Sequence, residues 1–184
     1  MSEPVLVAGL DVGGTKTLAV AILADRAAPP GPDGDGDDGA PRPAVVATVR
    51  RPTGVGGGDR LLASTAHVLA DLAAAAGVPV DGFAGVGVGV PGLVDRAAGT
   101  VRHAVNLGLD DTPVPLGEHL RSLAHAPVVV DNDVNLAAVG AAVALGCRGD
   151  LAYLSVGTGL AAGLVLDGRP RRGAHGAAGE IGHL

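Results

Sequence analysis

The chain begins with short apolar runs that lack a helical repeat. Residues 5–11 and 17–23 are two such runs, and the sequence VGGT lies between them. Apolar runs of this length bounded by glycine predict strands, and residues 44–50 predict a third. The intervening segment 26–43 reads RAAPPGPDGDGDDGAPRP and has no apolar periodicity, which predicts a flexible surface insert.

Helical periodicity first occurs after the third predicted strand. Apolar residues recur at intervals of three and four up to Ala76, with Asp59 as the expected N-cap and Gly77 as the expected stop. Three strands followed by alternating helices and strands predict an α/β fold with a mixed sheet flanked by helices. The later predicted elements are a buried strand (83–90), a short hairpin (94–105), a helix (116–125), a buried strand (128–130) and a helix (133–145) with Leu145 on its apolar face.

A second strand–turn–strand segment occurs late in the chain. VAGLDVGGTKTLAVAIL (7–23) and LAYLSVGTGLAAGLVLDG (151–168) share one design: an apolar strand, a small polar residue, a valine, a Gly/Thr turn and another apolar strand. Asp11 aligns with Ser155. The repeat predicts two related lobes, each presenting a Gly/Thr turn to a shared cleft.

Both turns have the chemistry of a phosphate site. Glycines adopt positive φ and lack a Cβ, so backbone N–H groups can approach a phosphoryl oxygen. Thr15 and Thr158 add hydroxyl donors, and Asp11 can position Mg²⁺ or its water ligands. Two ordinary hairpin turns, in which glycine is common, are the alternative interpretation.

Other nucleotide and metal motifs do not fit. A Walker loop needs Gly-Lys-Ser/Thr, which the sequence GTK at 14–16 does not supply. GVGVPG at 87–92 matches G-x-G-x-x-G, but residues 93–103 lack the helical periodicity that a dinucleotide site requires. The alternating aspartates of the insert resemble a calcium loop, yet Asp38 and Ala44 stand where that loop needs glycine and glutamate.

A polar segment lies where a predicted strand meets a predicted helix. PVVVDNDVN at 127–135 places Asn132 and Asp133 at the carboxyl end of the strand, where polar groups face a cleft. The helix dipole favours an ionised Asp133, which could accept a proton from a substrate hydroxyl in a phosphoryl transfer. Plain capping is the alternative, although three polar residues in a row exceed what one cap needs.

Composition narrows the choice of partner. The net charge is −6 and only Phe83 and Tyr153 are aromatic, so we expect no nucleic-acid partner. The longest uncharged apolar stretch, residues 82–94, is too short to span a bilayer, and the N-terminus lacks the basic segment of a secretory signal. We therefore expect a cytoplasmic protein with no membrane partner. Cys147 is the only cysteine, so no intramolecular disulfide can form.

Several motifs occur together in one order. They are LDVGGTK (10–16), GVGVPGLVD (87–95), AVNLG (104–108), VVVDNDVNLAAVG (128–140), LSVGTGLAAGLVLDG (154–168) and RGAHGAAGEIGHL (172–184). With them the chain resembles the ROK (repressor, open reading frame, kinase) family of sugar kinases, and within it the bacterial glucokinases. The resemblance implies the actin/hexokinase-like (ribonuclease H-like) fold. An N-terminal lobe would span 1–147 and the start of an incomplete, truncated second lobe 148–184.

The resemblance also implies a role for each matched residue. Asp133 would be the general base that deprotonates a sugar hydroxyl, and Asp11 would help hold Mg²⁺. The sugar ring would be hydrogen-bonded by Asn106, Asn132, Glu180 and His183. The ATP phosphates would lie against Gly13, Gly14, Thr15, Lys16, Gly157, Thr158 and Gly159. Taken singly, Asn106 also fits a hairpin turn, Glu180 the first turn of a helix, and His183 an ordinary surface histidine.

The chain departs from the family's pattern at several positions. Ala161 and Ala162 stand where the family has glycines after the second turn, and their methyl groups are expected to narrow the approach to ATP. Ala141 stands in place of a glutamate. Asp131 also replaces a glutamate, with the charge kept.

Family kinases continue past the motif that contains His183. Their later cysteines join that histidine around a structural zinc ion. Those cysteines do not occur in this sequence, and Cys147 is not one of them by position. We therefore expect the chain to be the first part of a longer kinase, in which His183 would be a zinc ligand.

These expectations converge on ATP-dependent phosphorylation of a hexose hydroxyl, with the conversion of glucose to glucose 6-phosphate as the first candidate. The alternatives are a non-catalytic sugar-binding or sensing protein and a ROK-type transcriptional regulator. Such regulators carry a helix-turn-helix before the first strand, where this chain has only residues 1–4, so a DNA-binding module is not expected. The resemblance implies a homodimer or homotetramer.

Overall fold

The computed structural model describes residues 3–24, 44–54, 56–157, 159–174 and 176–183, which form two compact units. The first unit contains the described residues up to Asn132, and the second begins at Asp133. The insert predicted over 26–43 lies outside the described residues. The lobe boundary after Cys147 stays a prediction.

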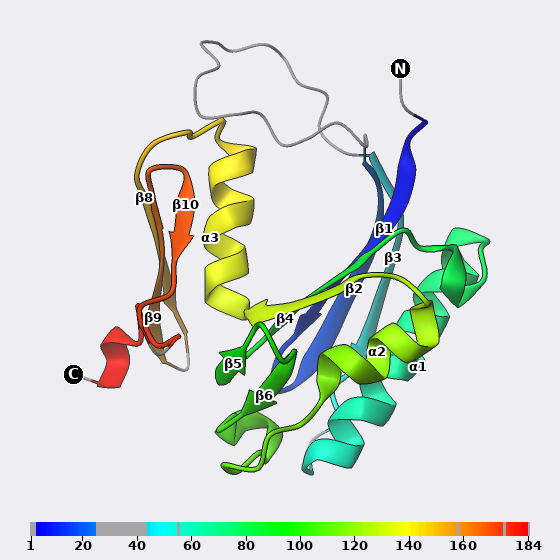
Figure 1. Cartoon of the computed structure of the whole chain (residues 1–184), viewed down its shortest axis with the longest axis horizontal. Coiled ribbons are helices and arrows are strands. Elements are labelled where there is room, and N and C mark those ends of the chain that lie inside the picture. The colour runs from blue at the N-terminus through cyan, green and yellow to red at the C-terminus, as the bar shows by residue number, and fades with distance from the viewer. Residues whose placement is uncertain (1–2, 25–43, 55, 158, 175, 184) are drawn as a thin grey trace. The chain divides into compact units, whose positions relative to one another are not determined.

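The first unit is built on a five-stranded mixed sheet with the order β3-β2-β1-β4-β7 (Figure 1). Strands β3, β2 and β1 pair antiparallel, whereas β1, β4 and β7 run parallel. The predicted mixed α/β architecture is therefore confirmed. The strands span Val5–Val12 (β1), Lys16–Ala24 (β2), Ala44–Pro52 (β3), Val86–Val90 (β4) and Val128–Asn132 (β7).

Two helices, α1 (Gly58–Ala76) and α2 (Leu116–Ala124), contact each other and pack on one face of this sheet (Figure 1). Successive side chains of a strand point to opposite faces, so alternate strand residues supply the core. On β4 these are the three valines, which share one hydrophobic cluster with Leu69 of α1 and Leu120 of α2. The remaining positions of β4 are Gly87 and Gly89.

Two predicted element starts are wrong. Helix α1 has Gly57 as its N-cap with no side-chain cap, and Asp59 lies inside its first turn. The strand predicted over 83–90 begins only at Val86, because the 3-10 turn η1 (Val80–Gly82) precedes it and Phe83 enters the core from the connecting segment. The predicted helix stop is confirmed, since Gly77 is left-handed and its N–H donates to carbonyls of the last turn.

The predicted hairpin is confirmed. Strands β5 (Leu93–Asp95) and β6 (Thr100–Arg102) pair antiparallel, and the 3-10 turn η2 (Val105–Leu107) follows. The segment after GVGVPG is therefore a hairpin and not a helix. A dinucleotide loop is excluded here because that site needs a helix N-terminus.

The second unit contains α3 (Asp133–Ala144), β8 (Leu151–Val156), β9 (Leu160–Leu166), β10 (Arg169–Arg171) and the 3-10 turn η3 (Ile181–His183). The strands form an antiparallel sheet of order β10-β9-β8, against which α3 packs. The helix and the sheet pack closely, since a Cβ added to Gly163 of β9 would lie only 2.6 Å from the Ala138 Cβ of α3.

The predicted buried face of α3 is partly wrong. Leu145 follows the helix and is 74% exposed, whereas Asn135 is buried. Nearly every residue of α3 is small and apolar, so the sequence hardly distinguishes one helix face from another.

None of the helices among the described residues is long and apolar enough to cross a membrane.

Candidate functional site

Polar residues gather at one edge of the first unit's sheet. Strands β1, β4 and β7 are parallel, so their carboxyl ends lie at the same edge. Asp11 pairs in register with Gly89, which pairs with Asp131. Residues in register on neighbouring strands point to the same face, so the two aspartates lie on one face with a residue that has no side chain between them. Asp11 is exposed and Asp131 is buried.

The first Gly/Thr turn is held by the backbone. The Gly13 N–H donates to the Lys16 carbonyl at 2.9 Å, and the Thr53 N–H donates to the Thr15 carbonyl at 3.1 Å. A Cβ on Gly13 would lie 3.0 Å from the Lys16 carbonyl oxygen, so the turn has little room for a side chain there. The side chains of Thr15 and Lys16 are exposed beside it.

The predicted sugar-binding Asn106 lies against this turn. It is the middle residue of η2, and a Cβ added to Gly14 would come within 2.9 Å of the Asn106 Cβ. The turn η2 is anchored by Leu107, which is fully buried and whose carbonyl accepts the N–H groups of Gly56 and Gly57. The structure therefore brings together a predicted phosphate-binding residue and a predicted sugar-binding residue from distant parts of the sequence.

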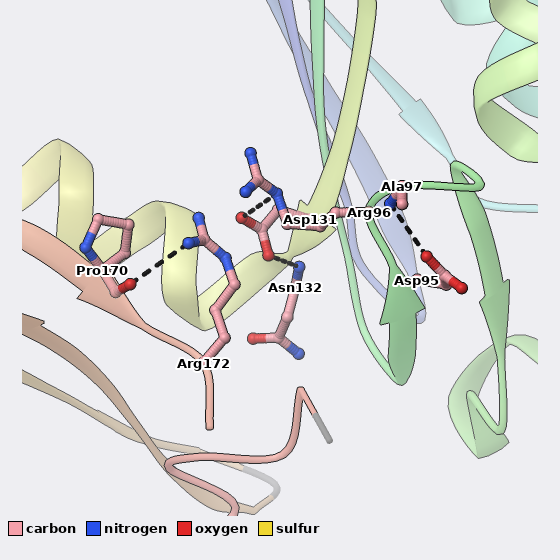
Figure 2. Close-up of polar contacts among 7 residues, drawn as sticks. All are labelled: Asp95, Arg96, Ala97, Asp131, Asn132, Pro170 and Arg172. Atoms are coloured by element: carbon pink, nitrogen blue, oxygen red, sulfur yellow. Dashed lines mark hydrogen bonds and ion pairs between the residues drawn. The ribbon is translucent and has the colours of Figure 1, made fainter. Parts of the chain in front are cut away.

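The end of β7 is fixed by polar contacts (Figure 2). One carboxylate oxygen of Asp131 accepts the Asn132 N–H at 2.9 Å, and the other lies 3.2 Å from the Arg96 Nε. The Asn132 side-chain amide donates to the Gly92 carbonyl at 3.5 Å. Arg96 was not among the predicted site residues, because nothing in the sequence indicates that a hairpin arginine meets this strand.

Asp133 is the first residue of α3, as predicted. It is half-buried, and its Oδ1 accepts the Val134 N–H at 2.9 Å. This contact is compatible with both interpretations from the sequence, a helix-start carboxylate and a general base.

The second Gly/Thr turn joins β8 to β9. The Gly157 N–H donates to the Gly159 carbonyl at 2.9 Å, and a Cβ added to either glycine would meet nothing within 4 Å. Packing against the described residues therefore does not require glycine here, in contrast to the first turn. Thr158 lies outside the described residues.

The alanines after this turn lie in β9, where Ala161 is half-buried and Ala162 is buried. The Ala162 N–H donates to the Gly179 carbonyl at 2.7 Å, which ties β9 to the segment that carries Glu180. Glu180 itself is half-buried. The last residue of η3 is His183, whose side chain lies outside the described part.

Within the described residues, no three His, Cys, Asp or Glu side chains gather in a way that could hold a metal ion. An open cavity of about 490 Å³ lies beside η2, and none of the predicted site residues lines it. It is bounded by Gly56, Gly57, Gly58, Asp59, Leu62 and residues 108–110 and 112–115.

The model of the ROK family matches residues 61–184, so the chain belongs to the ROK family. It is 31% identical to the glucokinase of Streptomyces coelicolor over 187 residues, which covers 97% of this chain and 49% of that relative. It is 43% identical to the xylose repressor of Caldicellulosiruptor bescii over 104 residues, which covers 55% of this chain and 26% of that relative. The family therefore contains both sugar kinases and repressors.

The fold agrees with solved structures of the family. The crystal structure of a ROK family glucokinase from Streptomyces griseus in complex with glucose and AMPPNP matches with a TM-score of 0.72 at 27% identity, covering 97% of this chain and 50% of that chain. The chain has the actin-like fold of the ROK hexokinases, as expected from the sequence. It spans about half the length, or less, of these three relatives.

Proposed function

We propose that the full-length protein transfers the γ-phosphoryl group of ATP to a hexose hydroxyl, with glucose as the first substrate to test. The extent of the glucokinase match carries this proposal. It covers 97% of the chain and therefore includes both the β1–β2 turn and the junction of β7 with α3. The xylose-repressor match covers 55%.

The first turn suits bound phosphates. A Cβ would crowd Gly13 and Gly14, whereas Thr15 and Lys16 are exposed next to them. Phosphoryl oxygens accept hydrogen bonds from donors of these kinds, namely backbone N–H groups, a hydroxyl and an ammonium group. Asp11 is exposed at the same edge and is the residue we assign to Mg²⁺. When bound, the cation would neutralise charge on the phosphates.

Asp133 is the proposed general base. Its position at the start of α3 favours the ionised carboxylate. The carboxylate would accept the proton of the sugar hydroxyl while that oxygen forms a bond to the γ-phosphorus and the bond to the β–γ bridging oxygen breaks. Asn106, Asn132, Glu180 and His183 would orient the sugar ring. His183 would also be a zinc ligand in the full-length protein, and no step of the reaction is assigned to that ion.

A sugar-responsive regulator is the second candidate, because the xylose repressor has the higher identity over the segment that it matches. Such a protein would bind a sugar without turning it over. Sugar binding and ADP formation measured on the same preparation therefore separate the two functions.

The test is ADP formation by the full-length protein across a panel of hexoses and xylose. We expect one hexose to drive turnover and Asp133→Asn to lower kcat about 100-fold or more. Asp71→Asn is the control, since Asp71 lies on α1, is 42% exposed and pairs with Arg51, and neither residue is assigned to the site. If calorimetry shows that a sugar binds but no sugar leads to ADP formation, the result would favour the sugar-responsive regulator.

A further inference from the structure

A buried carboxylate connects the β5–β6 hairpin to the end of β7. Asp131 is only 2% exposed, and both of its oxygens are engaged: Oδ1 with the Asn132 N–H and Oδ2 with the Arg96 Nε (Figure 2). Because both oxygens belong to one planar group, the carboxylate cannot rotate without disturbing both contacts. A change in the Arg96 contact would therefore also disturb the hydrogen bond to the backbone N–H of the next residue, Asn132.

The hairpin holds Arg96 in place for this contact. The carboxylate of Asp95 accepts the N–H groups of Ala97 and Ala98 at 2.9 and 3.1 Å, and the Gly99 N–H donates to the Asp95 carbonyl at 2.8 Å. The Gly99 carbonyl in turn accepts the Gly117 N–H of α2 at 2.8 Å. A tight turn tied to a core helix fixes the backbone from which the guanidinium reaches Asp131.

The charge of Asp131 gives this contact energetic weight. A carboxylate removed from water is stable only when it is paired and hydrogen-bonded. Arg96 remains 44% exposed, so its guanidinium keeps much of its hydration while one side faces the buried oxygen. Such a pair loses less hydration than one in which both partners are buried.

We propose that Arg96 is a positioning residue that sets the orientation of Asn132, and with it the hexose-binding end of β7, by clamping the carboxylate of Asp131. This inference rests on the proposed hexose kinase function for its kinetic consequence. The effect of Arg96 on the backbone at Asn132 can be measured by hydrogen exchange, without any turnover of substrate.

The experiment compares Arg96→Met, Arg96→Lys and Arg102→Met in the full-length protein. Arg102 is a matched control, because it lies in the same hairpin with a 49% exposed side chain, but its carboxylate partner Asp111 is 79% exposed. We measure hydrogen exchange of the peptide containing Asn132 together with KM for hexose and for ATP.

For Arg96→Met we expect about tenfold faster exchange at Asn132 and about a tenfold higher KM for hexose, with KM for ATP unchanged. Arg96→Lys should recover most of both effects, and Arg102→Met should resemble the parent protein. Three results would contradict the proposed role of Arg96. They are a change in both KM values, loss of global structure in Arg96→Met, and equal behaviour of Arg96→Met and Arg102→Met.

A double-mutant cycle tests whether Arg96 acts through Asp131. Asp131→Asn keeps an oxygen for the Asn132 N–H but removes the charge, so Arg96→Met should have no further effect on exchange in that background. Additive effects would contradict the proposal. If the parent protein forms no ADP with any sugar, the kinase proposal fails, while exchange at Asn132 still decides the role of Arg96.

Discussion

Gly14 and Asn106 pack against each other so closely that a Cβ on Gly14 would lie 2.9 Å from the Asn106 Cβ. Gly14 belongs to the turn between β1 and β2. Asn106 belongs to η2, which follows α1 and β4 in the sequence. A residue predicted to bind phosphate thus packs directly against a residue predicted to bind the sugar. A change on one side is expected to affect both.

Gly14→Ala tests this coupling. The added methyl group would push the turn and η2 apart, so we expect KM for ATP and KM for hexose to rise together in the full-length protein, each by about tenfold. Gly140→Ala is the control, because a Cβ at Gly140 would come within 4 Å of no residue in the part of the chain that the structure describes. A rise in only one of the two KM values would contradict a shared contact.

The buried hydroxyls of Thr17 and Thr53 lie 2.9 Å apart beneath the same turn. Thr17→Val or Thr53→Val leaves one buried hydroxyl unpaired, and we expect each to lower the free energy of unfolding by about 1–3 kcal/mol. The double substitution should cost less than the sum of the two, because no orphaned hydroxyl remains. Urea denaturation of the four proteins measures this, and strict additivity would show that the hydroxyls do not interact.

Two glycines of the second unit should respond in opposite directions to substitution by alanine. Gly163→Ala places a methyl group against Ala138 and the Val134 carbonyl oxygen of α3, so we expect a loss of about 1–3 kcal/mol. A Cβ at Gly140 of α3 would meet none of the described residues within 4 Å, so Gly140→Ala should add about 0.5–1 kcal/mol through helix propensity. Denaturation midpoints should therefore move to either side of the parent value, and a shift of both in one direction would refute the packing described here.

Asp110 should contribute a pH-dependent term to stability. Its carboxylate accepts the Thr112 N–H at 2.8 Å, and this hydrogen bond, with a smaller contribution from the Thr112 side chain, lowers the pKa of Asp110 below its ordinary value of 3.8. A lowered pKa in the folded state stabilises the protein above pH 3.8, and this stabilisation is lost as the pH falls through the lowered pKa.

Asp110→Asn should accordingly be less stable than the parent protein at neutral pH. The difference should shrink as the pH falls below 3.8 and disappear once the pH is below the lowered pKa of Asp110. Because the carboxylate is exposed, we expect a small effect. Urea midpoints at pH 7, 5 and 3 measure it. A difference that stays constant with pH would assign the effect to packing and not to ionisation.

The order and type of the α-helices and of the strands up to β9 were predictable from local patterns, whereas β10 and the 3-10 turns were not predicted. Strands β1 and β2 occur within one residue of the predicted ranges, because an apolar run bounded by glycine specifies its own ends. The start of α1 was not predictable in the same way. Asp59 has the chemistry of a cap, but Gly57 takes that position without a side-chain cap. The contacts of the residues before α1, which include those of Gly56 and Gly57 with Leu107, are made only in the folded chain.

The sequence by itself determined which chemical groups are available: two Gly/Thr turns that we propose bind phosphate, and a carboxylate at the start of α3. Its apolar periodicity also distinguished strands from helices. Only the tertiary structure decided how these groups meet. The register of β1, β4 and β7 places Asp11 and Asp131 on one face, and the hairpin brings Arg96 to Asp131. Local patterns depend on neighbouring residues along the chain, whereas an ion pair between distant residues depends on strand register and hairpin geometry, which are set only when the whole core packs.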